Sequence, residues 1–491
     1  MARGPLEQSF PWTPLSATGV RPADLWWGLH LFAAPFTAIG DPVVGLRISM
    51  AVWTAFCLAL LFVSVRRMSV QFAWCVPFIW LFSGALETGR LIALRPQNAS
   101  AALLVALVAL VTRPGPAWML VTVGWAVAFL HQTVSWIVVP VAVVAGASAC
   151  WSEKSAKPLI RIGWAVGGVG LGWVVRPAAL RAAALMQIQI GELSKARAQG
   201  LDLPFGTEVS KLTTAQFIHF FPAFAVVWLA LVGMGALAAY KSREHPDRCL
   251  PAAFAACAVL SLGFYELMLT ASTRGLKYWT VFAAVTMSLS GVLCVRSRGT
   301  DMKFSWALAG ALPVLTWATS WGAFSDFMSR GAIYPNRMQA PMEFLAANSM
   351  KGDLVWNAHW EFFGEMLFWD RKNVYVQGMD PIFLYSQNRE LCEIVDACRA
   401  DRWGDPSYPV LLPLVAGFAV SRDLYTALSE RFDARWALVL PSATPILASQ
   451  MGGDLRFTKM YDDGVVEIFK MGPTHLKAQV PGSLLIIPAD G

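Results

Sequence analysis

A succession of long apolar runs constrains this sequence more than any other feature. A helix needs roughly 20 predominantly apolar residues to cross the hydrocarbon core of a bilayer. With 56% hydrophobic and only 14% charged residues over 491 positions, the composition is that of an integral membrane protein. The runs predict about ten spanning helices, at about Val43–Val65, Phe72–Leu86, Ala99–Val111, Ala117–Leu130, Val134–Cys150, Ile160–Val175, Phe217–Tyr240, Leu250–Thr270, Trp279–Val295 and Phe304–Gly322.

Basic residues gather in every second connection between these runs and indicate how the helices are oriented. Short cytoplasmic loops of membrane proteins carry an excess of Lys and Arg. This bias explains the net charge of +7, so no nucleic-acid partner is expected. We predict that five connections face the cytoplasm, namely those with Arg66 and Arg67, Arg113, Lys154/Lys157/Arg161, Lys241/Arg243/Arg248 and Arg296/Arg298/Lys303.

The opening stretch, Pro11–Asp41, joins turn-forming residues to a short aromatic and apolar run. That run, Leu25–Ile39, is too short to span a membrane, and its two Trp residues and His30 favour the boundary between water and lipid. We expect a helix lying in the interface with Asp24 at its amino end, where the helix dipole favours a charged carboxylate. Two roles stay open for Asp24, a helix cap and a catalytic group.

Several cations are expected on the outward face, beside the ends of the apolar runs. An Arg guanidinium can bind a phosphate with two parallel hydrogen bonds. The alternative for the Arg residues is anchoring at lipid headgroups, and the alternative for the one His among them is a structural role. The candidate lipid-phosphate contacts are Arg90 and Arg95 in the loop Glu87–Asn98, His131, Arg176, Arg274 and Lys277.

One carboxylate and several cations around an outward cavity suit transfer from a lipid-phosphate donor. The carboxylate of Asp24 would take a proton from an acceptor hydroxyl. The cations would stabilise the negative charge that develops on the leaving phosphate.

The tail, from Ser325 to Gly491, has a different composition and is predicted to be a small soluble α/β domain. Asp462-Asp463-Gly464 is a hairpin signal between two strand-like runs. We expect strands at Asp353–Asn357, Lys372–Val376, Ala437–Leu440, Phe457–Tyr461 and Val465–Met471, and helices at Pro341–Asn348, Arg389–Ala400 and Arg422–Arg431.

Polar side chains follow the first two expected strands of this tail. Asn357, His359 and Glu361 come after the first, and Asp380 comes after the second. An α/β domain places its binding sites at the carboxyl ends of its strands, so we expect these residues to bind an acceptor or to cover the cavity. A divalent cation held by His359, Glu361 and Asp380 is one interpretation, and turn or cap roles are the other. The spacing matches no established ligand motif, so no metal is assigned.

Four stretches resemble the GT-C-type membrane glycosyltransferases, in particular the bacterial group related to the dolichyl-phosphate-mannose-type enzymes. They are PWTPLSATG followed by ADLWWGLHLFAAPFTAIGD, RPQNASAALLVALV, FLHQTV and GDLVWNAHWEFFGEMLFWDRKNVYVQGMDPIFLY. They occur in the expected order over most of the chain, and the first and last are the distinctive ones. The resemblance implies a polyprenyl-phosphate sugar as donor and an acidic catalytic residue in the first outward loop, for which Asp24 is the candidate.

The sequence departs from this family at its start. Members of the family usually have an initial spanning helix, followed by a pair of acids at the start of the loop. Here the sequence starts around the middle of that loop. We therefore expect an upstream helix to be missing, or the protein to be a degenerate homologue without transferase activity. In the first case the base would lie upstream of Met1, and Asp24 would be the second acid.

Taken together, these features predict an inverting transferase in the bacterial inner membrane. It would move a sugar from a polyprenyl-phosphate donor to a glycan, lipid or protein acceptor of the cell envelope, on the periplasmic face. The expected division is an outward loop with an interfacial helix (1–42), a transmembrane helical domain of GT-C type (43–324) and a periplasmic α/β domain (325–491). The alternative is a non-catalytic lipid-binding scaffold or a transporter-like protein.

Overall fold

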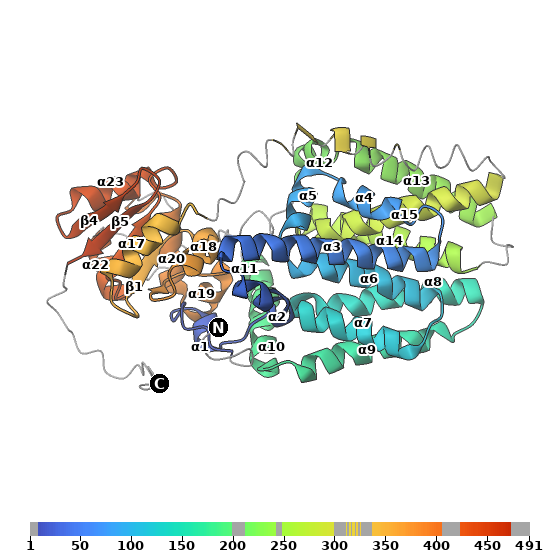
Figure 1. Cartoon of the computed structure of the whole chain (residues 1–491), viewed down its shortest axis with the longest axis horizontal. Coiled ribbons are helices and arrows are strands. Elements are labelled where there is room, and N and C mark those ends of the chain that lie inside the picture. The colour runs from blue at the N-terminus through green and yellow to red at the C-terminus, as the bar shows by residue number, and fades with distance from the viewer. Residues whose placement is uncertain are drawn as a thin grey trace. The chain divides into compact units, whose positions relative to one another are not determined.

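The chain forms two compact units (Figure 1). The computed structural model describes residues 8–198, 212–241, 248–298, 336–404 and 423–472, with scattered positions between 311 and 325. The helical unit comprises Met1–Ser9, Ala23–Gln187 and Phe205–Tyr334. The sheet unit comprises Phe10–Pro22, Ile188–Pro204 and Pro335–Gly491. The opening stretch is therefore divided between the two units, and the three-part division expected from the sequence stays a prediction.

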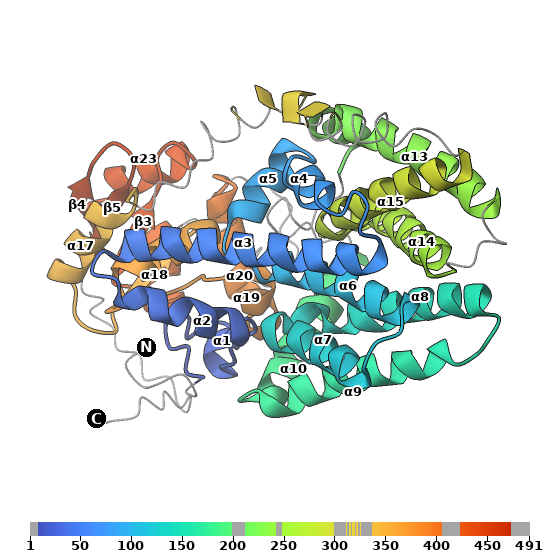
Figure 2. The ribbon, with the colours of Figure 1, turned by 45° about the vertical axis from the view of Figure 1, so that its right-hand side comes forward.

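The helical unit is a bundle whose long helices run alongside one another (Figure 2). Its helices are α2 (Trp27–Ala33), η1 (Ala34–Ala38), α3 (Pro42–Met68), α4 (Cys75–Leu81), α5 (Ala85–Ile92), α6 (Pro96–Thr112), α7 (Ala117–Leu130), η2 (Gln132–Ile137), α8 (Val138–Glu153), α9 (Pro158–Val175), α10 (Ala179–Gln187), α12 (Thr214–Phe220), α13 (Pro222–Lys241), α14 (Cys249–Thr270) and α15 (Gly275–Arg298).

Six of the helices in the described residues are long and apolar enough to cross a membrane, which makes this a multi-pass membrane protein. They are Pro42–Met68, Gln132–Glu153, Pro158–Val175, Phe224–Lys241, Cys249–Thr270 and Gly275–Ser297. Two further expected spans, α6 and α7, form shorter apolar helices. The last expected span, Phe304–Gly322, lies largely outside the described residues, so the total of about ten stays a prediction.

The second expected span is not one straight helix. Where the sequence predicted a single run at Phe72–Leu86, α4 and α5 meet at an angle of 109°. Gly84 stands at the break, and a Cβ atom there would lie 2.5 Å from the ring of Phe221. Only glycine permits this close approach of the α4–α5 break to Phe221. The following stretch, Glu87–Asn98, is accordingly not a loop, because it forms most of α5 and the start of α6.

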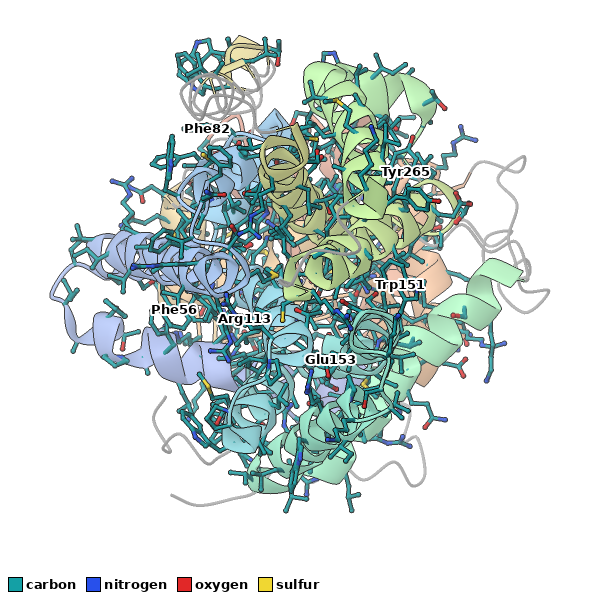
Figure 3. All side chains as sticks on the ribbon, turned by 90° about the vertical axis from the view of Figure 1, so that its right-hand side faces the viewer. Phe56, Phe82, Arg113, Trp151, Glu153 and Tyr265 are labelled. Carbon is teal, nitrogen blue, oxygen red and sulfur yellow. The ribbon has the colours of Figure 1, made fainter. Side chains whose placement is uncertain are left out.

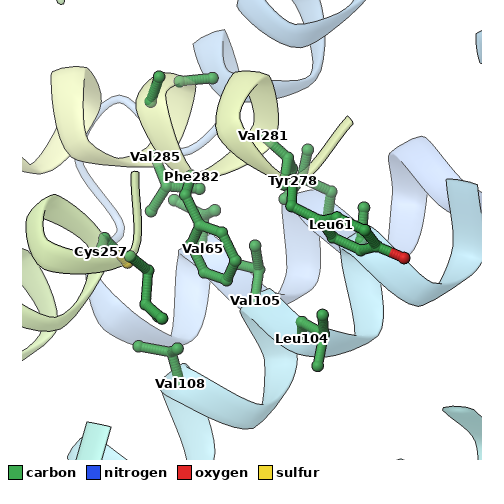
Figure 4. Packing of buried hydrophobic residues seen from close by; sticks show 14 of the residues in the cluster. Leu61, Val65, Leu104, Val105, Val108, Cys257, Tyr278, Val281, Phe282 and Val285 are labelled. Atoms are coloured by element: carbon green, nitrogen blue, oxygen red, sulfur yellow. The ribbon is translucent and has the colours of Figure 1, made fainter. Parts of the chain in front are cut away.

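The core of the helical unit surrounds α6. Nearly every residue of this helix is buried, and its Ala, Leu and Val side chains contact α3, α14 and α15. Figure 4 shows this packing, with Leu61 and Val65 from α3 facing Val105 of α6 and Phe282 of α15. A helix that is apolar on all sides is expected to lie inside a bundle.

Small residues bring α7 and α9 together. A Cβ atom on Gly124 of α7 would lie 2.1 Å from the carbonyl oxygen of Ala165, and one on Gly168 of α9 would lie 2.1 Å from that of Val121. Such positions let helices approach closely in a bilayer, where van der Waals packing drives helix association.

Two of the basic connections that the sequence placed on one side contact each other, while Arg243 and Lys303 lie outside the described residues. Arg67 Nη2 donates to the carbonyl of Pro114 (3.0 Å), and Arg113 Nη1 donates to that of Arg67 (2.8 Å). Arg161 reaches Glu153 at 2.9 Å. Figure 3 looks onto this end of the bundle, with Arg113 and Glu153 labelled. We call it the basic end. Apolar side chains such as Phe56 and Trp151 stand exposed on the bundle, as a lipid-facing surface requires.

The sheet unit has five strands in the order β2-β1-β3-β5-β4. The strands β1 (Leu354–Asn357), β2 (Val374–Tyr375) and β3 (Trp436–Val439) are parallel, whereas β4 (Phe457–Asp462) and β5 (Glu467–Met471) form an antiparallel hairpin. Each strand falls where the sequence predicted one. Its helices are α1 (Ala17–Val20), η3 (Ile188–Glu192), α11 (Leu193–Ala198), α17 (Gln339–Asn348), η4 (Trp360–Phe362), α18 (Phe363–Trp369), α19 (Pro381–Gln387), α20 (Arg389–Arg399), α22 (Leu424–Thr426), η5 (Ala427–Arg431) and α23 (Pro445–Gly453).

The start of the opening stretch packs within the sheet unit. The carbonyl of Trp12 accepts from the backbone N–H of Tyr375 (2.7 Å), and the Trp12 indole donates to the carbonyl of Arg371 (3.1 Å). Trp12 therefore hydrogen-bonds to the edge of β2 that does not pair with β1.

Candidate functional site

Asp24 lies in the turn that leads into α2, near the start of the segment Ala23–Gln187 of the helical unit. Its Oδ1 accepts from the backbone N–H of Trp26 (2.9 Å), and its Oδ2 lies 2.5 Å from Nδ1 of His30. The helix begins at Trp27, so Asp24 precedes it without capping its first turn. The carboxylate is thus held in a defined orientation by a turn and by the side chain of His30 at the start of α2.

The backbone of Asp24 is held from two other directions. Its N–H donates to Oε1 of Gln8 (2.7 Å), and its carbonyl accepts from Nη2 of Arg176. The Nη1 group of Arg176 donates to Oε1 of Gln132. Arg176 therefore joins the end of α9, the start of η2 and the Asp24 turn.

Two pKa values follow from this arrangement. Burial lowers the pKa of Arg176 to about 10 while the charge of Asp24 opposes the change, so the guanidinium stays charged at neutral pH. Burial acts to lower the pKa of His30, but the hydrogen bond to Asp24 and its charge outweigh burial and raise that pKa above 6.5. Asp24 and His30 therefore form a hydrogen-bonded carboxylate–imidazole pair, in which the carboxylate favours the charged form of the imidazole.

A second polar group lies where α5 meets α15. Glu87 is fully buried, and its Oε1 lies 2.6 Å from Nζ of Lys277. The indole of Trp80 donates to the same oxygen (3.1 Å). The positive charges of Arg90 and Arg95 lie close enough to act on Lys277. The structure thus pairs Lys277 with a carboxylate that the sequence had not paired with any cation, and it places the charges of Arg90 and Arg95 near Lys277.

Side chains of Asn98 and Trp53 hold the backbone around Arg90 and Arg95 through hydrogen bonds. The amide of Asn98 donates to the carbonyl groups of Leu91 (2.8 Å) and Ala93 (3.0 Å). The indole of Trp53 donates to the carbonyl of Arg95 (2.8 Å). Asn98 is therefore a structural residue that closes the turn between α5 and α6.

His131 is buried at the end of α7 and contacts Oγ of Ser100 through Nδ1 (3.1 Å). Burial, assisted by the charge of Arg274, lowers the pKa of His131 to about 3. The imidazole is therefore neutral at physiological pH, and any contact with a phosphate would be a hydrogen bond without a charge. Its neighbour Gln132 holds Arg176. The group around Asp24 and Arg176 and the group around Glu87 and Lys277 therefore lie at one end of the helical unit, which we call the polar end.

An open cleft of about 500 Å³ borders the Asp24 turn. It is lined by Gln8, which holds the backbone of Asp24, and by residues 177–181, which follow Arg176. A second groove of about 450 Å³ lies along α3 and is lined by Arg47, Met50, Ala51, Thr54, Ala55, Leu58 and Ile92.

The four candidates of the sheet unit have different surroundings. The amide of Asn357 exchanges two hydrogen bonds with the backbone of Gln377 (2.9 and 3.1 Å), so it joins the ends of β1 and β2. His359 Nδ1 lies 3.3 Å from Glu361, which Arg399 also approaches (3.5 Å). Asp380 precedes α19 and accepts from the amide of Gln189 (3.0 Å).

Burial acts to raise the pKa of Glu361, but the His359 hydrogen bond and nearby positive charge outweigh burial and lower that pKa. Within the described residues, no group of three or more His, Cys, Asp or Glu side chains is placed to hold a metal ion. His359, Glu361 and Asp380 therefore do not form the cation site that was one interpretation of their spacing.

Comparisons with solved structures identify the type of fold. The chain is similar to the oligosaccharyltransferase of Archaeoglobus fulgidus in its apo form, with a TM-score of 0.55 and 11% identity over 88% of this chain and 63% of that one. The same enzyme in complex with Zn and sulfate gives 0.55 and 12% over 88% and 61%. The chain has a GT-C-like fold. It spans about three fifths of the length of the oligosaccharyltransferase.

A further similar structure is ArnT from Cupriavidus metallidurans bound to undecaprenyl phosphate, with a TM-score of 0.48 and 13% identity over 91% of this chain and 88% of that one. No protein-family model matches the sequence, and no curated protein matches it.

Sequence reasoning gave no role in the site to His30, Gln132 or Gln8, and it did not pair Glu87 with Lys277. The signal for His30 was present, because an acid just before a helix and a His one turn inside it can meet. The pairing of Glu87 had no local signal, since Lys277 is far away along the chain.

Proposed function

We propose that this chain is a GT-C-type membrane glycosyltransferase that transfers a sugar, with inversion, from a polyprenyl-phosphate donor to an acceptor of the bacterial cell envelope. The observation that carries the proposal is the GT-C-like fold with a half-buried carboxylate, Asp24, held against the buried Arg176 at the polar end. We place the polar end at the periplasmic face, opposite the basic end.

Inversion requires one displacement, in which the acceptor oxygen attacks the anomeric carbon from the side opposite the phosphate. Asp24 acts as the base for the acceptor hydroxyl or supports that base. Positive charge stabilises the leaving phosphate as the bond to the sugar breaks. We assign this role to Arg90, Arg95, His131, Arg176 and Arg274, with His131 contributing a hydrogen bond only. Lys277 would act indirectly, because its ammonium group is buried against Glu87.

The groove along α3 suits the prenyl chain of the donor. Its lining is apolar apart from Thr54 and Arg47, and Arg47 stands in the second turn of the helix on the Asp41 side. An apolar chain therefore fits along Met50 to Leu58, with a phosphate headgroup towards Arg47.

The sheet unit would supply the acceptor contacts or a cover. We keep Asn357, His359, Glu361 and Asp380 in this role. Asn357 would act indirectly, because its amide is used to join two strands.

The test is product formation by the full-length chain in lipid nanodiscs, with a panel of labelled polyprenyl-phosphate sugars and envelope acceptors. The expected result is transfer by the wild type and a loss of roughly 100-fold or more in Asp24→Asn. The matched control is Asp41→Asn, because Asp41 caps α3 and asparagine caps equally well.

Full turnover in Asp24→Asn would remove Asp24 from the mechanism. Binding of polyprenyl phosphate without turnover of any donor would favour a lipid-binding scaffold instead.

A further inference from the structure

We propose that His30 takes the proton from the acceptor hydroxyl, and that Asp24 is a positioning residue that orients and stabilises its imidazole. This inference rests on the proposed function and adds to it a residue that carries the proton.

The geometry of the pair assigns these roles. Nδ1 of His30 lies 2.5 Å from Oδ2 of Asp24, so the carboxylate accepts a hydrogen bond from Nδ1–H and leaves the lone pair of the neutral ring on Nε2. The His30 side chain is 48% exposed and that of Asp24 is 27% exposed. Nε2 makes no hydrogen bond to any of the described residues. The imidazole is thus the more accessible member of the pair, with its basic nitrogen open to an incoming hydroxyl.

Each oxygen of the Asp24 carboxylate, in contrast, already has a partner. One oxygen accepts from the backbone of Trp26 and the other contacts His30. The backbone of Asp24 is tied to Gln8 and to the buried Arg176. A group fixed at four points is well suited to orienting another side chain.

Few other charges act on the pair. Arg176 donates to the backbone carbonyl of Asp24 rather than to the carboxylate, so it leaves the negative charge available to His30. The helix α2 packs against α7 and η1, and neither of these elements has a titratable side chain. The pair Asp24–His30 therefore determines the protonation of the imidazole.

The resulting step is balanced. The acceptor oxygen forms a bond to the anomeric carbon, and the bond between that carbon and the phosphate oxygen breaks with its electron pair leaving on the prenyl phosphate. The hydroxyl proton passes to Nε2 of His30. The imidazolium keeps its Nδ1 proton on the ring, hydrogen-bonded to Asp24, and the carboxylate stabilises its charge until Nε2 releases its proton to water.

The experiment measures kcat/KM against pH for the full-length protein in nanodiscs. In the wild type, activity should rise with pH through a pKa above 6.5, because only the neutral imidazole is a base. In Asp24→Asn the remaining activity should rise at lower pH, since the partner that raises the His30 pKa is gone. His30→Asn keeps a donor near the Nδ1 position but lacks Nε2, and it should lose roughly 100-fold or more in kcat. The control is His219→Gln, an exposed residue of α12.

A second readout does not depend on turnover. Nitrogen-15 spectra of histidine-labelled protein, with the His30 signal assigned by its absence in His30→Asn, should show the Nδ1–H form of the neutral ring. An Nε2–H form, or wild-type turnover by His30→Asn, would overturn the role of His30 and leave the glycosyltransferase proposal standing. Absence of transfer from every donor by the wild type would overturn both.

Discussion

Single residues in this protein derive their roles from what is buried beside them. Glu87 and Lys277 show this most directly, because neither charge has access to water and the two form an ion pair at 2.6 Å. Taking two charges out of water is costly, and removing one partner is costlier still, since the other remains buried and uncompensated. The pair therefore ties the α4–α5 break to α15.

The Glu87–Lys277 pair predicts a test of stability. Lys277→Met should destabilise the helical unit by roughly 3–5 kcal/mol, because it leaves the Glu87 carboxylate buried without a partner. Adding Glu87→Gln should recover much of that loss. Thermal unfolding in detergent measures both. The control is Lys195→Met, whose partner Glu192 is 2.8 Å away on an exposed surface, and which should change little. Equal losses in the two single variants would contradict the role given to the pair.

A pH-dependent contribution is expected in the sheet unit. The hydrogen bonds that Arg456 donates hold the pKa of Asp423 at about 2, despite some burial of the carboxyl group. A lowered carboxyl pKa stabilises the fold above the unfolded value of 3.8 and loses that effect as pH falls towards 2. Arg456→Gln should therefore cost at most about 1 kcal/mol at pH 7, because the pair is partly exposed. The difference from wild type should vanish near pH 2, as urea unfolding at several pH values would show.

At the scale of elements, the strands and most long helices could be predicted from the sequence, and the site could be predicted only in part. Alternating and continuous apolar runs have a local physical meaning, so β1 to β5 fall where they were expected. The break at Gly84 depends on Phe221, and the site depends on Arg176 reaching Asp24 across the bundle. These are tertiary contacts, and no local pattern determines them. His30 was noticed for its preference for the interface, whereas its position beside Asp24 required the turn of α2.

The close approach of α7 and α9 predicts a contrast between two glycines of one helix. Gly168→Val should disrupt the pair, because even a Cβ atom there would lie 2.1 Å from the carbonyl of Val121. Gly170→Val should be tolerated, since nothing lies within 4 Å of its Cβ position. Yield of folded protein and thermal unfolding compare them. Similar behaviour of the two variants would show that α9 does not pack on α7 through this face.

For the whole molecule, the important property is its polarity along the bundle. The basic connections lie at one end, and the Asp24 and Glu87 groups lie at the other. By the positive-inside rule, we propose that the basic end is cytoplasmic. The proposed function requires this orientation, because the polyprenyl-phosphate donor would be used at the outer surface.

Cysteine accessibility in intact cells tests the orientation. Thr37→Cys lies in η1, on the side of the polar end, and Ala156→Cys lies in the basic connection between α8 and α9; both positions are exposed. A membrane-impermeant thiol reagent should modify the first in intact cells and the second only after the membrane is opened. The opposite pattern would invert the topology and exclude transfer at the outer face.

The enclosure of α6 has a consequence for how this protein tolerates change. Helix α3 buries a residue about every fourth position, such as Ser49, Trp53, Cys57 and Leu61, and turns its other sides to the surroundings. Tolerance to substitution along α3 should therefore follow the helical period, with low tolerance at the buried positions and high tolerance at the others. Along α6 neighbours surround every side of the helix, so tolerance should show no such period and nearly every position should resist a larger side chain. Among related sequences, the apolar positions of α6 should then vary only among apolar residues of similar or smaller size, and α6 is the segment in which divergent members of this fold should align best.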